Sequence, residues 1–192
     1  FISDVVGLGK TFICAMLANQ LNGKHLVIAP PVLLDKENPG SWTNAFEDFG
    51  VRQSNFVSIG KLDTLLDGNS DKYENVFIDE AHRMRNADTA TYEKLTEICR
   101  GKKVILVSAT PYNNSPMDIF SLVKLFQKPR NSTLPLLKNL DSFFKNLDRN
   151  IKKEDRRRDY QSFLKVTEEN AKAVRDRVLK YLMVRRTRSD IV

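Results

Sequence analysis

Several features are scarce or absent in this 192-residue sequence. No apolar run approaches the roughly 18 residues that a membrane-spanning helix needs, and the first residues lack the basic flank and apolar core of a signal peptide. The two cysteines, Cys14 and Cys99, fall within apolar helical patterns, which favours reduced core thiols over a disulfide framework. Cysteine and histidine show no metal-ligand spacing, which argues against zinc. We therefore expect a cytoplasmic globular protein without a membrane partner, nucleoid-associated if its source is bacterial.

The charge is distributed unevenly along the chain. Residues 129–192 hold 17 lysines and arginines against 9 acidic residues, a net of +8, whereas residues 1–128 hold 14 against 15. This asymmetry favours a near-neutral core joined to a basic segment that meets nucleic acid, although a solvated helical face would carry the same charge. The sequence begins with Phe1, and its first residues are typical of the end of a strand, so we expect a fragment of a longer protein.

Helical spacing and short apolar runs alternate along the first two thirds of the chain. This alternation predicts an α/β fold with a mostly parallel sheet between helices. After about residue 135 the strands end, and a polar sequence keeps a helical rhythm to about residue 184. We therefore expect a core domain over 1–128 and a basic helical extension over 129–192. Helices are expected within 10–23, 41–50, 89–101 and 115–127, and strands within 25–30, 55–59, 73–80 and 102–109.

Two of the expected helices carry start signals, Ser41 as an N-cap and Pro116 in a first turn. The apolar face of the first helix comprises Ile13, Met16, Leu17 and Leu21. That of the second comprises Trp42, Ala45, Phe46 and Phe49, a stripe more typical of core packing than of base stacking.

The stretch DVVGLGKT, residues 4–11, follows an apolar strand end and leads into a helix, which is the context of a phosphate-binding loop. The standard pattern is G-x-x-x-x-G-K-[ST], and Asp4 stands where its first glycine would be. Glycines let backbone N–H groups turn around phosphate at a helix N-terminus. The lysine would reach the β- and γ-phosphates of ATP, and the threonine hydroxyl would bind Mg²⁺. The candidate nucleotide-binding residues are Gly7, Leu8, Gly9, Lys10 and Thr11.

Two further motifs lie at the ends of expected strands. In NVFIDEAH, Asp79 and Glu80 follow an apolar strand, at the edge where open α/β sheets bind ligands. Asp79 would hold Mg²⁺ through water, and Glu80 would orient and deprotonate the water that attacks the γ-phosphate. An acidic cap after the strand is the simpler alternative, disfavoured next to a phosphate loop. The strand in VILVSATP ends in Ser108, Ala109 and Thr110, common turn residues that gain meaning from their order behind the other two motifs.

Together, D-x-x-G-L-G-K-T, I-A-P-P-x-L-L, D-E-A-H-R-x-R-N and S-A-T-P-Y-N-N resemble the first motor lobe of superfamily-two helicases. The resemblance is greatest to the Swi/Snf-type translocases on double-stranded DNA. In that family Asp is common at the place of Asp4, whereas Val5 departs from the usual acidic residue. The ending YLMVRRTRSDIV resembles the basic stretch before the family's second lobe.

The resemblance implies a RecA-like fold that uses ATP and Mg²⁺, with Lys10, Asp79 and Glu80 in catalysis. It also implies a second RecA-like lobe with arginines that complete the site. Since that lobe is absent here, we expect the isolated chain to hydrolyse ATP poorly or not at all. By resemblance, His82, Ser108, Ala109 and Thr110 would couple the nucleotide site to nucleic acid. Candidate contacts to DNA phosphates are Lys61, Arg83, Arg85, Arg185 and Arg186.

The resemblance predicts an ATP-dependent translocase on duplex DNA without sequence preference. A strand-separating helicase or an RNA-directed one would share the same motifs. A non-catalytic nucleic-acid-binding module with an inactive loop is an alternative from another class. An unrelated phosphate-loop ATPase fits the four ordered motifs least well.

Overall fold

The sheet of this protein has four parallel strands in the order β2-β1-β3-β4, which confirms the predicted α/β class. The computed structural model describes residues 1–3, 7, 9–66, 68–84, 90–109, 115–154, 156–157 and 159–185. The strands are β1 (His25–Ala29), β2 (Ser54–Ser58), β3 (Asn75–Ile78) and β4 (Lys103–Leu106). Every residue of β1 and β3 is buried, as expected for central strands of a sheet that is covered on both faces.

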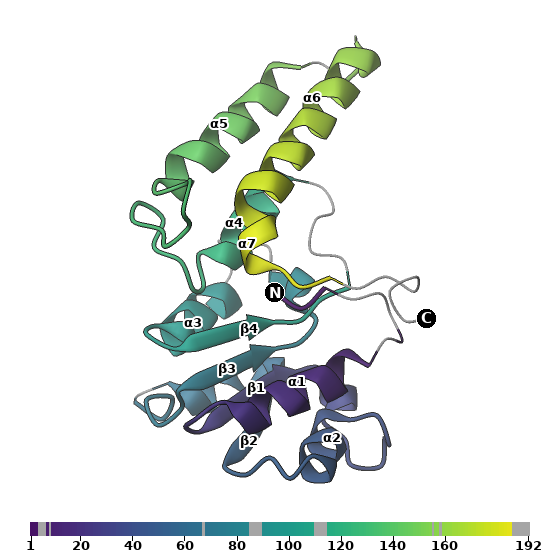
Figure 1. Cartoon of the computed structure of the whole chain (residues 1–192), viewed down its shortest axis with the longest axis vertical. Coiled ribbons are helices and arrows are strands. Elements are labelled where there is room, and N and C mark those ends of the chain that lie inside the picture. Colours follow the sequence, from purple (N-terminus) through teal and green to yellow (C-terminus); the bar gives the residue numbers. More distant parts are fainter. Residues whose placement is uncertain are drawn as a thin grey trace.

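Helices cover both faces of the sheet (Figure 1). On one face, α1 (Lys10–Gln20) and α2 (Trp42–Asp48) pack against Val27 and Phe77. On the other face lie α3 (Ala90–Cys99) and one side of α4 (Pro116–Val123). Short 3₁₀ segments follow three of the strands: Pro31–Leu33, Ile59–Leu65 and Ala81–Met84.

The predicted start signals are present in the structure. Ser41 caps α2 by accepting a hydrogen bond from the N–H of Asn44. Ser115 and Asp118 form a capping box at the start of α4, with Pro116 at its first position. These caps satisfy N–H groups that the helices leave unpaired.

The predicted face of α1 was wrong at Met16, which is 50% exposed. The fully buried residues of α1 are Cys14, Ala15 and Ala18. Small side chains let the helix backbone approach the sheet closely, so the larger Ile13 and the rest of the predicted face lie only partly buried at the margin of this contact. Both cysteines are buried, as predicted.

A short segment extends the sheet beyond β4. Ile2 bridges in parallel to Val107 on one side and to Val184 on the other. The residues that follow Ile2, Val107 and Val184 therefore emerge at the same carboxyl edge as the ends of β1 and β3.

The chain after α4 is helical, as predicted. It contains α5 (Leu140–Lys153), α6 (Tyr160–Val174), a π-helical turn over Arg175–Leu179, and α7 (Lys180–Leu182). In Figure 1, α5 and α6 lie side by side and extend away from the sheet. Their apolar faces share a core with the second side of α4. The division of the chain at residue 128 remains a prediction. Among the helices described here, none is both long and apolar enough to span a membrane.

Candidate functional site

The glycine loop precedes α1 and has the backbone conformation that glycine permits. Gly7 and Gly9 have φ angles of +86° and +71°, in the left-handed region that other residues avoid. A Cβ atom at Gly7 would meet no atom within 4 Å, so the conformation itself requires glycine there. Gly9 is the N-cap of α1 and offers no side chain to the first N–H groups of the helix. Those groups can therefore face an anion.

The two residues after the loop lie on the first turn of α1. Lys10 and Thr11 are both half-buried. Burial raises the pKa of the Asp79 carboxyl, and the positive charge of Lys10 is one of the groups that oppose this increase. The predicted phosphate-binding lysine and the predicted Mg²⁺-binding carboxylate therefore interact electrostatically. Leu8, between the two glycines, lies outside the described residues.

Asp79 follows the last residue of β3 and is only 7% exposed. Its Oδ2 accepts a hydrogen bond of 2.7 Å from Nε1 of Trp42, and its Oδ1 accepts one of 2.7 Å from the N–H of Glu80. Burial raises the pKa of Asp79 above its usual value. The Trp42 N–H, the Glu80 N–H and Lys10 oppose this increase because they stabilise the charged form.

Glu80 lies in a polar cluster with His82 and Ser108. Its φ angle of +52° is unusual for a residue other than glycine, and strained backbone of this kind is common at functional sites. Oε2 of Glu80 lies 3.0 Å from Nδ1 of His82, which lies 3.2 Å from Oγ of Ser108. Ser108 is buried and donates its backbone N–H to the carbonyl of Ile2. The cluster therefore connects the ends of β3 and β4.

The candidate nucleic-acid contacts are dispersed. Lys61 is exposed and lines a pocket of about 520 Å³ between the loop after β1 and β2. Arg83 is exposed in the turn after Glu80, and Arg185 is exposed directly after Val184. The other candidate contacts, Arg85 and Arg186, lie outside the described residues. Of the residues predicted to couple the two sites, Ala109 is half-buried next to Ser108, and Thr110 lies outside the described residues.

Sequence reasoning missed the role of Trp42 at this site. The apolar spacing placed it correctly in the core, where it is fully buried. A buried tryptophan usually has a hydrogen-bond partner for its indole N–H, so a partner of Trp42 could have been expected from the sequence. The sequence pattern could not identify that partner as Asp79, since the two residues are 37 positions apart.

Comparisons with known proteins identify the family. The model of the SNF2-related domain matches residues 32–192. The uncharacterized ATP-dependent helicase YqhH of Bacillus subtilis is 27% identical over 66% of this chain and 26% of its own length. The human DNA repair and recombination protein RAD54-like is 31% identical over 41% of this chain and 12% of its own length. The chromatin structure-remodeling complex subunit snf21 of Schizosaccharomyces pombe is 26% identical over 99% of this chain and 18% of its own length.

A solved structure shows the same fold. The SWI2/SNF2 ATPase core of Sulfolobus solfataricus, in complex with dsDNA, matches with a TM-score of 0.61 and 22% identity. The match covers 99% of this chain and 40% of that chain. This chain spans between 10% and 26% of the length of the curated relatives it matches. With a family model that covers most of its residues and a RecA-like fold, the chain belongs to the SNF2-related domain family.

Proposed function

We propose that this chain is the first ATP-binding lobe of a Swi/Snf-type motor that couples ATP hydrolysis to movement along duplex DNA. The observation that carries the proposal is the meeting of three motifs at one edge of the sheet. The glycine loop, Asp79 with Glu80, and Ser108 converge there from separate parts of the sequence. A ligand at this edge also agrees with the general position of sites in open α/β sheets.

The residues at this edge fit ATP with Mg²⁺. Positive φ angles at Gly7 and Gly9 turn the backbone before α1, and the space around Gly7 is open. Asp79 uses one lone pair on each oxygen for the Trp42 and Glu80 hydrogen bonds, which leaves acceptor capacity on both oxygens. A bound Mg²⁺ would supply positive charge that offsets the negative charge of the phosphates. Asp79 and Thr11 would hold the ion, and Lys10 would bind the phosphates.

Glu80 would act on the attacking water. Its carboxylate is half-exposed, and one oxygen is already engaged by His82. The other oxygen can accept the proton of a water and orient that water toward the γ-phosphate. Because His82 also contacts Ser108 at the end of β4, a shift of either strand end would move Glu80. This cluster is our candidate for the link between DNA binding and hydrolysis.

DNA would bind through its phosphates. The Sulfolobus SWI2/SNF2 core was solved with dsDNA, and RAD54-like proteins are named for DNA repair and recombination. In this chain Lys61, Arg83 and Arg185 are exposed cations, suited to sequence-independent contacts that weaken with salt. A second lobe elsewhere in the full-length protein would complete the ATP site. The location of the protein in the cytoplasm stays a prediction.

The test is ATP turnover by the full-length protein, with the Lys10→Ala variant as control. Turnover is measured without nucleic acid and with duplex DNA, single-stranded DNA or RNA at one fixed salt concentration. We expect strong stimulation by duplex DNA that Lys10→Ala abolishes. Displacement of a triplex-forming strand, without separation of the duplex, would then report translocation. Stimulation by single strands or RNA instead would favour a strand-separating helicase, and absence of any turnover would favour a non-catalytic module.

A further inference from the structure

The indole of Trp42 makes a direct hydrogen bond to the carboxylate that is expected to hold Mg²⁺. Nε1 of Trp42 lies 2.7 Å from Oδ2 of Asp79, and the contact is buried, with Trp42 at 0% and Asp79 at 7% exposure. The other oxygen, Oδ1, accepts the backbone N–H of Glu80. Two donors on two oxygens fix the rotation of the carboxylate about its terminal bond. A carboxylate held in this way keeps its remaining lone pairs in one fixed plane.

The ring of Trp42 is held by aromatic neighbours. Its centroid lies 5.8 Å from that of Phe46, one turn later on α2, and 6.1 Å from that of Phe77 on β3. Phe77 and Asp79 project from the same face of the chain, because side chains alternate along a strand. The tryptophan therefore packs against β3 and bonds to the residue at its end. A rotation of the indole would break packing with both phenylalanines.

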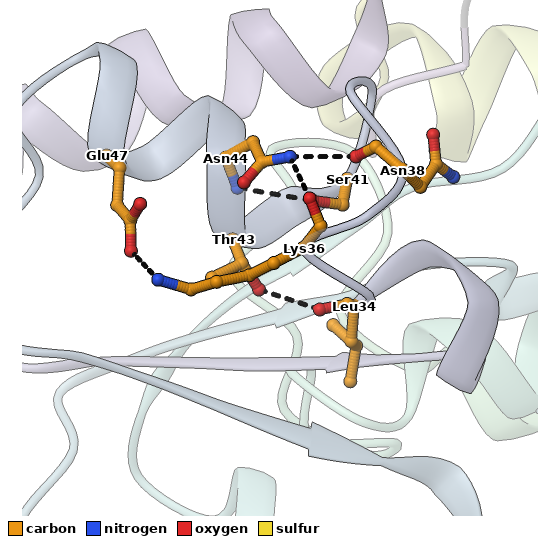
Figure 2. A network of polar contacts seen from close by, with 7 residues as sticks. All are labelled: Leu34, Lys36, Asn38, Ser41, Thr43, Asn44 and Glu47. Carbon is orange, nitrogen blue, oxygen red and sulfur yellow. Dashed lines mark hydrogen bonds and ion pairs between the residues drawn. The ribbon is translucent and has the colours of Figure 1, made fainter.

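The start of α2 is anchored as well, by the polar contacts that Figure 2 shows. This anchoring fixes the backbone of Trp42, the first residue of the helix. The side chain of Asn44 donates to the carbonyls of Lys36 and Asn38, at 2.9 and 2.8 Å. The hydroxyl of Thr43 donates to the carbonyl of Leu34 at 2.9 Å. These bonds tie the first turn of α2 to the loop that leaves β1. The same network includes the Ser41 cap and an ion pair between Lys36 and Glu47.

From this arrangement we propose that Trp42 is a positioning residue, whose N–H aims the Asp79 carboxylate at the Mg²⁺ of a bound nucleotide. The inference rests on the proposed function and adds a residue outside the phosphate loop and the DEAH motif to that site. If Trp42 served only in packing, an apolar ring such as that of phenylalanine would be sufficient. Phenylalanine, however, has no N–H that could donate to the buried carboxylate of Asp79.

The first experiment compares Trp42→Phe with Ile98→Val in this chain. Ile98 is a core residue at 0% exposure, but it lies on α3, on the opposite face of the sheet from Trp42. Binding of a fluorescent ATP analogue is titrated with Mg²⁺ at fixed nucleotide, and also measured in EDTA. We expect Trp42→Phe to raise the Mg²⁺ concentration at half-saturation about 10–100-fold, the usual effect of losing a hydrogen-bond partner of a metal ligand. The affinity in EDTA should stay near the wild-type value. Ile98→Val should lower the melting temperature without moving the Mg²⁺ midpoint.

A second measurement needs no variant. Trp42 is the single tryptophan of this chain, so its emission reports on the partner of its N–H. We expect Mg²⁺ with ATP to change that emission, whereas ATP in EDTA leaves it nearly unchanged. This readout keeps the proposal testable if Trp42→Phe fails to fold.

The outcomes separate this inference from the proposed function. Wild-type chain that binds nucleotide with Mg²⁺, together with an unchanged midpoint in Trp42→Phe, overturns the positioning role alone. Equal midpoint shifts in Trp42→Phe and Ile98→Val also overturn it, because general loosening of the core then explains the effect. Absence of Mg²⁺-dependent binding by the wild type, matching Lys10→Ala, overturns both proposals.

Discussion

Phe144 on α5 packs the helical extension against α4. It is fully buried, and its ring stacks on Phe120 of α4 with centroids 4.9 Å apart. The neighbouring Phe143 meets it edge to face at 5.2 Å. Replacing a buried phenylalanine with alanine costs about 3–5 kcal/mol, because transfer free energy is lost and a cavity remains. For a chain of this size each kcal/mol lowers the melting temperature by about 2–4 °C. Phe144→Ala should therefore lower it by roughly 6–20 °C.

The assay is urea unfolding followed by circular dichroism, with thermal melts as a second probe. Leu136→Ala is the matched control, since Leu136 lies in the same region but is 66% exposed, and we expect it to change stability by less than about 0.5 kcal/mol. The free energy of unfolding should fall for Phe144→Ala alone. A decrease in the free energy of unfolding below about 1 kcal/mol would refute the reasoning, because removing a buried ring with these contacts should destabilise the chain by more than that.

Three further predictions concern the site and the pH dependence of stability. Glu80→Gln should retain nucleotide binding and slow turnover in the full-length protein by about 10²–10⁴-fold, since an amide cannot accept the proton; near-normal single-turnover rates would exclude Glu80 as the base. Ser108→Ala removes the hydroxyl 3.2 Å from His82 and should reduce stimulation by duplex DNA about 5-fold or more; equal losses with and without DNA would argue against a coupling role. Burial lowers the pKa of His25 below its usual value, although the negative charge of Glu74 opposes this decrease. Between the folded-state pKa and about pH 6.5, the unfolded chain therefore binds more protons than the folded chain. Stability should thus fall as the pH drops from about 6.5 toward the folded-state pKa, and His25→Gln should flatten this slope in urea unfolding; an identical slope in the variant would contradict it.

The sequence predicted the strands well because burial on both faces leaves a direct mark. Continuous apolar runs correspond to β1 and β3, every residue of which is buried. Capping residues were equally readable, since Ser41 and Pro116 act through their own local backbone. The buried face of α1 could not be predicted from the sequence, because the close contact with the sheet selects small residues such as Ala15 and leaves Met16 exposed. Hydrophobicity alone does not encode how closely a helix approaches.

The candidate site, too, could be predicted only in part. Asp79 and Glu80 could be located from the strand that precedes them, because a parallel sheet gathers its carboxyl ends at one edge. Contacts between separate motifs could not be located from local pattern. His82 and Ser108 are 26 positions apart, and only the register between β3 and β4 brings them within 3.2 Å.

The helical extension contacts the rest of the described chain through α4 and, at its other end, through Val184, which makes a consequence of Phe144→Ala measurable far from α5. At one end α5 packs on α4. At the other end Val184 donates its N–H to the carbonyl of Phe1, and its own carbonyl accepts the N–H of Ser3, directly before the glycine loop. Loss of packing in the extension should therefore free these two amides. We expect hydrogen exchange to accelerate at Ser3 and Val184 together with α5, while β2, on the opposite edge of the sheet, keeps its protection. Faster exchange confined to α5 would show that the two attachments act independently.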